Sequence, residues 1–132
     1  MLTYLWIALG SALGGVARYA ASTWVAQLVA GPFPWGTLLV NVTGSFLIGV
    51  FAVIGPPGGR WAISPDARLF LTVGVCGGYT TFSSFSLQTL DLIREGHMAA
   101  AGANIAGSVL LCLLATWAGA MAAHLLMGGR PA

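Results

Sequence analysis

The groups of this sequence that could do chemistry are hydroxyl, amide and aromatic side chains, gathered inside a run without charge. That run covers residues 69–90, and its centre reads Gly74-Val-Cys-Gly-Gly-Tyr-Thr-Thr-Phe-Ser-Ser-Phe-Ser86. Gly77 and Gly78 each lower helix propensity by about 1 kcal/mol relative to alanine, so we expect a helix to be interrupted there. Backbone groups freed at membrane depth must be buried in protein or face a wet cavity. Because free carbonyls of broken helices bind ions in membrane proteins, the segment predicts an ion site.

Two stripes of polar residues accompany this segment, each with one member every four residues. They are Thr37, Asn41 and Ser45 in the first stripe, and Asn104, Ser108, Cys112 and Thr116 in the second. This spacing places the members of a stripe on one face of a helix. An amide such as that of Asn41 is expensive in lipid unless it bonds to a neighbouring helix or faces water, and both interpretations stay open. Phe82 and Phe85 share a helix face, where their positive ring edges could replace the water around a small anion. Ordinary packing explains the same spacing.

Charged and nucleophilic residues exclude several classes of function. No Ser/His/Asp set, His/Glu pair or pair of carboxylates falls within the apolar runs, so we expect no enzyme. A proton-coupled transporter would need a carboxylate within the membrane, and none is expected there. Cys76 and Cys112 read as small buried apolar side chains. Arg18 lies inside an apolar run, and either attracts anions in a vestibule or snorkels to the membrane surface. A net charge of +2 indicates no nucleic-acid partner.

Composition and apolar runs predict the elements that must position these residues. The 132 residues are 58% hydrophobic and 6% charged, against about 25% charged in soluble domains, which indicates a membrane protein. A spanning helix needs about 20 apolar residues, and Gly31-Pro-Phe-Pro34 divides the longest run. We therefore predict an all-α membrane protein with one domain, residues 1–132, and four transmembrane helices over 3–29, 35–54, 65–90 and 97–127. The first span reads as an uncleaved helix rather than a signal peptide.

Local signals refine these spans. Ser64-Pro65-Asp66 is a helix start, with a serine cap, proline in the first position and an acid in the first turn. Residues 56–59, rich in proline and glycine, predict an exposed loop. The third helix is expected to stop at Gly77 and Gly78 and to resume near Thr81. Gly10 and Gly14, four residues apart, allow another helix to approach closely. The arginines expected on the two sides of the membrane nearly balance, with Arg60, Arg68 and Arg130 against Arg18 and Arg94. This is a weak bias, and a chain with so little preference could insert in both orientations.

Three segments together closely resemble the Fluc (CrcB) family of fluoride channels, and the resemblance as a whole covers all four predicted helices in order. They are Gly14-Gly-Val-Ala-Arg18-Tyr19, Pro34-Trp-Gly-Thr-Leu-Leu-Val-Asn41-Val-Thr-Gly-Ser45 and residues 74–86. The resemblance implies an antiparallel, dual-topology homodimer in the lipid bilayer of the bacterial inner membrane. It also implies two pores through which fluoride leaves the cell passively, which relieves fluoride toxicity.

The resemblance further implies roles for individual residues. A structural Na⁺ would be held at the centre of the dimer by the backbone carbonyls of Gly77 and Thr80. Phe82 and Phe85 would form an aromatic box in the pore. The other positions expected along the fluoride path are Asn41, Ser83 and Ser108, with Thr37 and Asn104 from the two stripes, and Arg18 near the vestibule.

Four positions depart from the family pattern. Ser84 replaces a usual threonine but keeps its hydroxyl, whereas Gln88 replaces a common glutamate and cannot titrate. The other two are on the fourth helix, where Ala100 and Asn104 stand in place of a frequent tyrosine and a common serine. We carry over no role that depends on the replaced groups.

Two other interpretations remain open on the sequence. The first is a small multidrug-type transporter with four helices, which would need a buried acid that this sequence lacks. The second is a membrane assembly subunit that transports nothing, in which the polar stripes only join helices.

Overall fold

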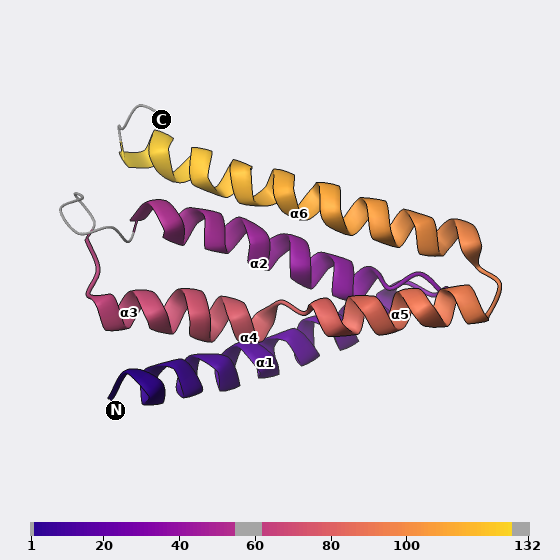
Figure 1. Ribbon diagram of the computed structural model, residues 1–132, viewed down its shortest axis with the longest axis horizontal. Helices are drawn as coiled ribbons and strands as arrows, with labels where there is room; N and C mark the ends of the chain where they lie inside the picture. Colours follow the sequence, from indigo (N-terminus) through magenta and orange to yellow (C-terminus); the bar gives the residue numbers. More distant parts are fainter. Residues whose placement is uncertain (1, 55–61, 128–132) are drawn as a thin grey trace.

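A computed structural model describes residues 2–54 and 62–127, and within these ranges the chain is helical, without a β-strand. The elements in order are α1 (Leu2–Leu28), α2 (Trp35–Ile54), α3 (Pro65–Leu69), η1 (Phe70–Cys76), α4 (Gly77–Tyr79), α5 (Phe82–Arg94) and α6 (Met98–Met127). The segments from α3 to α5 follow one another as a single rod, so four rods run up and down (Figure 1). The four predicted helical regions are therefore present, with ends within a few residues of those expected. The predicted loop at 56–59, Arg60 and Arg130 lie outside the described residues.

The rods form an antiparallel bundle. The beginning of α1, the end of α2, the beginning of α3 and the end of α6 lie at the same end of the bundle (Figure 1). The most extensive contacts join α2 to α6, and α1 to η1 and α4. Glycines make these contacts close: a Cβ on Gly10 would lie 2.6 Å from the carbonyl oxygen of Phe70, and one on Gly14 would lie 2.7 Å from the amide nitrogen of Tyr79. The close approach predicted from Gly10 and Gly14 is confirmed.

The outer surface of the bundle is apolar. α2 and α6 are long and apolar enough to cross a membrane, judged by length and composition. The 27 residues of α1 span about 40 Å at 1.5 Å per residue, more than the roughly 30 Å of a hydrocarbon core. Large apolar side chains remain exposed along these helices, including Leu13 on α1 and Leu113 on α6. Such a surface suits lipid rather than water.

The third rod begins as predicted and then changes its winding. The Ser64 side chain accepts a hydrogen bond from the amide of Ala67, and proline follows in the first helical turn. From Phe70 to Cys76 the chain is a π-helix, with hydrogen bonds between residues five apart. Nothing in the sequence predicted this segment. It lies against α1 and ends immediately before the glycine pair.

The helical pattern does not stop at the glycine pair, which is where we expected it to stop. Gly77 and Gly78 are helical, and the extended residues are Thr80, with φ −78° and ψ 157°, and Thr81, with φ −153° and ψ 116°. The physical reason is the neighbouring helix. A Cβ on Gly78 would lie 2.8 Å from the Cα of Ser11, so this glycine serves the contact with α1.

Candidate functional site

Asn41 on α2 pairs with the backbone of Thr81, between α4 and α5. Its Nδ2 donates to the carbonyl of Thr81 at 3.0 Å, and the amide of Thr81 donates to its Oδ1 at 2.7 Å. Both the amide nitrogen and the hydroxyl of Thr80 donate to the carbonyl of Cys76, each at 2.9 Å. Buried backbone groups without partners are costly, so these bonds stabilise the extended residues. The amide of Asn41 has a second N–H that this pairing does not use.

The side chain of Thr81 starts the next helix. Its Oγ1 accepts a hydrogen bond from the amide of Ser84 at 3.2 Å, the geometry of a helix N-cap. The hydroxyls of Ser83 and Ser84 lie 3.2 and 3.1 Å from the same oxygen. Thr81 is thus held by α2 through its backbone and by α5 through its side chain, and only 7% of it is exposed.

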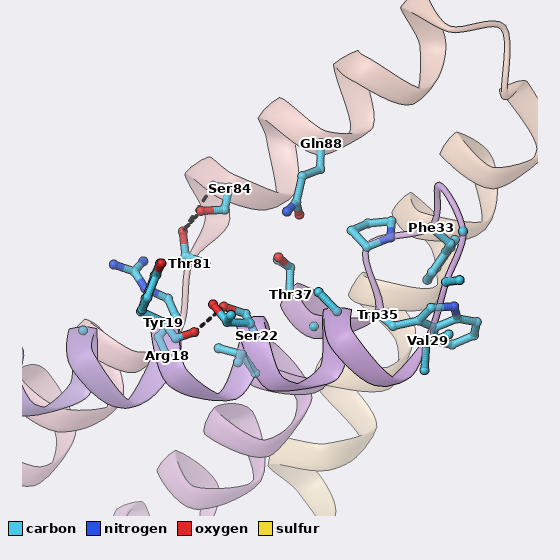
Figure 2. A pocket seen from close by; sticks show the side chains of 18 residues that line it. Arg18, Tyr19, Ser22, Val29, Phe33, Trp35, Thr37, Thr81, Ser84 and Gln88 are labelled. Atoms are coloured by element: carbon cyan, nitrogen blue, oxygen red, sulfur yellow. Dashed lines mark hydrogen bonds between the residues drawn. The ribbon is translucent and has the colours of Figure 1, made fainter.

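A first cavity, which we call the arginine cavity, opens between α1, α2 and α5. It has a volume of about 620 Å³, and its polar lining includes Arg18, Ser22, Thr37, Thr81, Ser84 and Gln88. Thr37 and Gln88 point into it from α2 and α5 (Figure 2). The Oε1 of Gln88 is buried, with no hydrogen-bond partner in the described part of the chain. A polar atom in such a place favours occupation of the cavity by water or a small solute.

A second cavity, which we call the aromatic cavity, lies on the other side of Thr81 and has a volume of about 430 Å³. The rings of Phe82 and Phe85 have centroids 5.1 Å apart and planes inclined at 48°. Phe85 is 8% exposed, whereas Phe82 is 76% exposed. The residues of interest in its lining are Asn41, Ser45, Cys76, Gly77, Thr80, Thr81, Phe82, Phe85, Ser108 and Cys112.

The structure brings most of the predicted site residues to these two cavities and leaves two outside. Arg18 and Thr37 line the arginine cavity. The six that line the aromatic cavity are Asn41, Gly77, Thr80, Phe82, Phe85 and Ser108. Ser83 lines neither cavity and is exposed on the single chain. Asn104 lines neither cavity either; it is 1% exposed on α6, where it bonds Thr89 of α5. That any of these residues contacts a permeating ion stays a prediction.

The sequence analysis did not place Thr81 among the site residues, nor the face of α5 that carries Ser84 and Gln88. Thr81, Ser84 and Gln88 are spaced by three and four residues, so their shared face could have been inferred from spacing. Gly44 was missed for a different reason. A Cβ there would collide with the Thr80 side chain and lie 3.1 Å from Cδ1 of Tyr79, and only the folded structure shows this contact.

These features define a class: an all-helical membrane protein with one polar and one mainly apolar cavity, which share Thr81 between α4 and α5. Residues 5–120 match the profile of the family described as CrcB-like protein, Camphor Resistance (CrcB), and the chain belongs to this family. The resemblance indicated by the three motifs is therefore confirmed.

Curated relatives carry a functional name. The chain is 58% identical to "Fluoride-specific ion channel FluC" of Methylocella silvestris, over 89% of this chain and 90% of the relative. It is 56% identical to the protein of the same name from Opitutus terrae, over 93% of each chain. It is 54% identical to that of Paramagnetospirillum magneticum, over 96% of this chain and 98% of the relative. The family is thus one of ion channels rather than enzymes.

Proposed function

We propose that this protein is a fluoride-selective channel of the bacterial inner membrane, through which fluoride leaves the cell down its electrochemical gradient. The observation that carries the proposal is the identity of 58%, nearly end to end, with a relative named as a fluoride-specific ion channel. The two cavities that meet at Thr81 support a path through the bundle. Neither a carboxylate nor a nucleophile is needed for passive transport of this kind.

The path begins in the arginine cavity. The guanidinium of Arg18 raises the local concentration of anions there, since fields are focused in clefts lined by one sign of charge. The hydroxyls of Thr37 and Ser84 can donate to fluoride and replace part of its water. The N–H₂ group of Gln88, whose side chain lines the same cavity, can donate as well.

The path continues past Thr81 into the aromatic cavity. The second N–H of Asn41 is a donor at this junction, since the first one is bonded to Thr81. Beyond it, the edges of the Phe82 and Phe85 rings carry partial positive charge, and Ser108 offers a hydroxyl. Neutral donors of this kind compensate the lost hydration of an anion without the strong trapping of a buried cation.

An antiparallel homodimer would complete the aromatic cavity. Phe82 is 76% exposed on the single chain although it lies beside the buried Phe85. Ser83, next to it, is exposed as well. A second copy packed over this face would cover both residues and enclose the path from the lipid side. The nearly balanced arginines of the sequence support insertion in both orientations.

A Na⁺ ion at the centre of this dimer is also part of the proposal. Gly77 and Thr80 line the aromatic cavity, on the face that the second copy would cover. Two backbone carbonyls from each copy would supply four oxygen ligands, the type that hard cations take. In the described residues no group of three His, Cys, Asp or Glu side chains could hold a metal ion, so carbonyl oxygens are the ligands that fit. The ion would join the two extended segments.

The decisive experiment is efflux of fluoride from liposomes that contain the purified protein, read with a fluoride electrode, with chloride efflux in parallel. We expect rapid fluoride release when a potassium ionophore compensates the charge, slow release without it, and negligible chloride release. Replacement of Na⁺ by a large organic cation on both sides should reduce the fluoride rate. If folded protein releases neither ion, the proposal is wrong and the interpretation as an assembly subunit replaces it.

A further inference from the structure

Three buried polar residues form a chain of hydrogen bonds that begins and ends at the aromatic cavity. Ser108 Oγ lies 3.4 Å from Oδ1 of Asn104, Asn104 Nδ2 lies 2.8 Å from Oγ1 of Thr89, and Thr89 Oγ1 lies 2.7 Å from the carbonyl oxygen of Phe85. The exposed fractions of these three side chains are 8%, 1% and 7%. Ser108 and Phe85 line the cavity, whereas Thr89 and Asn104 line neither cavity.

The carbonyl oxygen of Phe85, at the end of this series of hydrogen bonds, determines which group donates in each of them. A carbonyl oxygen cannot donate, so the hydroxyl of Thr89 must donate to Phe85. The Thr89 oxygen can then only accept, so the amide of Asn104 must turn its N–H₂ toward Thr89. Its Oδ1 therefore faces Ser108, and the hydroxyl of Ser108 must be the donor of the remaining bond.

The hydroxyl of Ser108 is consequently turned the wrong way for an anion. In the resting arrangement its proton points to Asn104 and its lone pairs are left for the cavity. An anion needs the proton, so Ser108 must release Asn104 and rotate before it can donate to the ion. The bond that must break is the longest of the three at 3.4 Å, well beyond the usual 2.7–2.8 Å of a hydroxyl donor, and is therefore weak.

We propose that Thr89 and Asn104 are positioning residues that hold the Ser108 proton away from the cavity until an anion arrives. Both lie outside the two cavities of the single chain, so they act on the ion through Ser108. Their effect is to weaken the affinity of the aromatic cavity for an anion at rest, which favours its release. This inference rests on the proposed function, because it describes how the same path handles fluoride.

Thr89→Val tests the inference at a site outside both cavities. Valine keeps the shape of threonine but removes the acceptor of Asn104, so the amide can turn and Ser108 can keep its proton free. We expect the fluoride concentration that gives half-maximal efflux to fall by about two- to threefold, the lower end of the range for one hydrogen bond, because the bond of 3.4 Å is weak. Asn104→Leu, which removes the Ser108 acceptor directly, should shift it in the same direction.

The Ser108→Ala background separates this role from a structural one. There, both substitutions should change the half-maximal concentration less than twofold, because no hydroxyl remains to be positioned. Thr72→Val is the matched control. The Thr72 hydroxyl also bonds the carbonyl four residues earlier, that of Arg68 at 2.8 Å, but it takes no part in the hydrogen bonds between Ser108, Asn104 and Thr89. This substitution should leave the concentration dependence unchanged.

Two outcomes would overturn the inference while the wild-type protein conducts fluoride. One is an equal effect of Thr89→Val with and without Ser108. The other is a lower maximal rate with an unchanged half-maximal concentration, which a merely structural role predicts. Failure of the wild-type protein to conduct would instead reject the proposed function.

Discussion

Asn41→Leu is the substitution that most directly tests how the extended residues are held. It removes the two hydrogen bonds, of 3.0 and 2.7 Å, that join α2 to the backbone of Thr81. Thr81 is 7% exposed, so water in the two cavities that it lines reaches only a small part of this residue once its carbonyl and amide lose their partners. An unsatisfied buried group costs about 1–3 kcal/mol, so the two together cost roughly 2–6 kcal/mol. That range is large against the marginal stability of most folded proteins, about 5–15 kcal/mol.

Hydrogen–deuterium exchange measured on the peptide around Thr81 gives the most local readout. A loss of even 1.4 kcal/mol corresponds to a factor of ten, so we expect the exchange of the Thr81 amide to accelerate by at least about tenfold. Fluoride efflux from liposomes should fall, and the apparent melting temperature in detergent should decrease. Leucine keeps the number and branching of the side-chain heavy atoms of asparagine and is the larger residue, so loss of packing volume does not explain such a result.

Thr43→Val is the matched control on the same helix. The Thr43 hydroxyl bonds the carbonyl of Leu39 at 2.8 Å and lies 3.1 Å from the hydroxyl of Tyr79, and Thr81 is not among its hydrogen-bond partners. It should leave the exchange at Thr81 close to that of the wild type. If Asn41→Leu protein shows unchanged exchange at Thr81 and conducts fluoride normally, the extended segment does not depend on this pairing and our reasoning about it is refuted.

Three further predictions address packing, electrostatics and the aromatic rings. Gly14→Ala should lower the melting temperature, because its Cβ would lie 2.7 Å from the Tyr79 amide nitrogen. Gly15→Ala should not lower it, because nothing lies within 4 Å of a Cβ there. Equal melting temperatures of the two variants would contradict this packing. Arg18→Gln should slow fluoride efflux several-fold at about 0.01 M salt and much less at 0.1 M, because the screening length falls from about 30 to 10 Å. An effect independent of salt would argue against long-range attraction of fluoride by the Arg18 guanidinium. Phe82→Ile and Phe85→Ile should each reduce fluoride efflux at least several-fold while gel filtration shows an unchanged assembly, because isoleucine has no positive ring edge. Wild-type rates in both would remove the rings from the mechanism.

The helices could be predicted well from the sequence because their ends depend on local chemistry. Pro34 precedes α2, which begins at Trp35, and Ser64 caps the helix that begins at Pro65. Proline disfavours continuation of a helix, and a serine cap satisfies a free amide, whatever the rest of the chain does. Such signals need no knowledge of the neighbouring helices.

The centre of the third rod could not be predicted because it depends on neighbours. Gly78 looks like a helix breaker in the sequence, yet its lack of a side chain serves the contact with Ser11. The partner of Asn41 was likewise open, since an amide on a helix face is compatible with both a pore and a helix contact. The structure shows the bond to Thr81 and leaves one N–H of the amide for another acceptor.

The site itself could be predicted in composition but not in arrangement. Phe82 and Phe85 share a face, as their spacing indicated, but the very different exposure of the two rings was not evident. Asn104 belongs to a regular polar stripe with Ser108, and spacing alone did not reveal that it lies against Thr89 on another helix.

The position of Thr81 in the lining of both cavities has an electrical consequence. Water in the open arginine cavity would carry the potential of its own side of the membrane inward as far as this residue. The membrane voltage would then fall over the remaining stretch instead of over the whole hydrocarbon core of about 30 Å. A voltage of 100 mV acting on one elementary charge amounts to about 2.3 kcal/mol, and the same energy applied over a shorter distance gives a larger force. A negative cell interior would thus push a monovalent anion hardest in the stretch beyond Thr81.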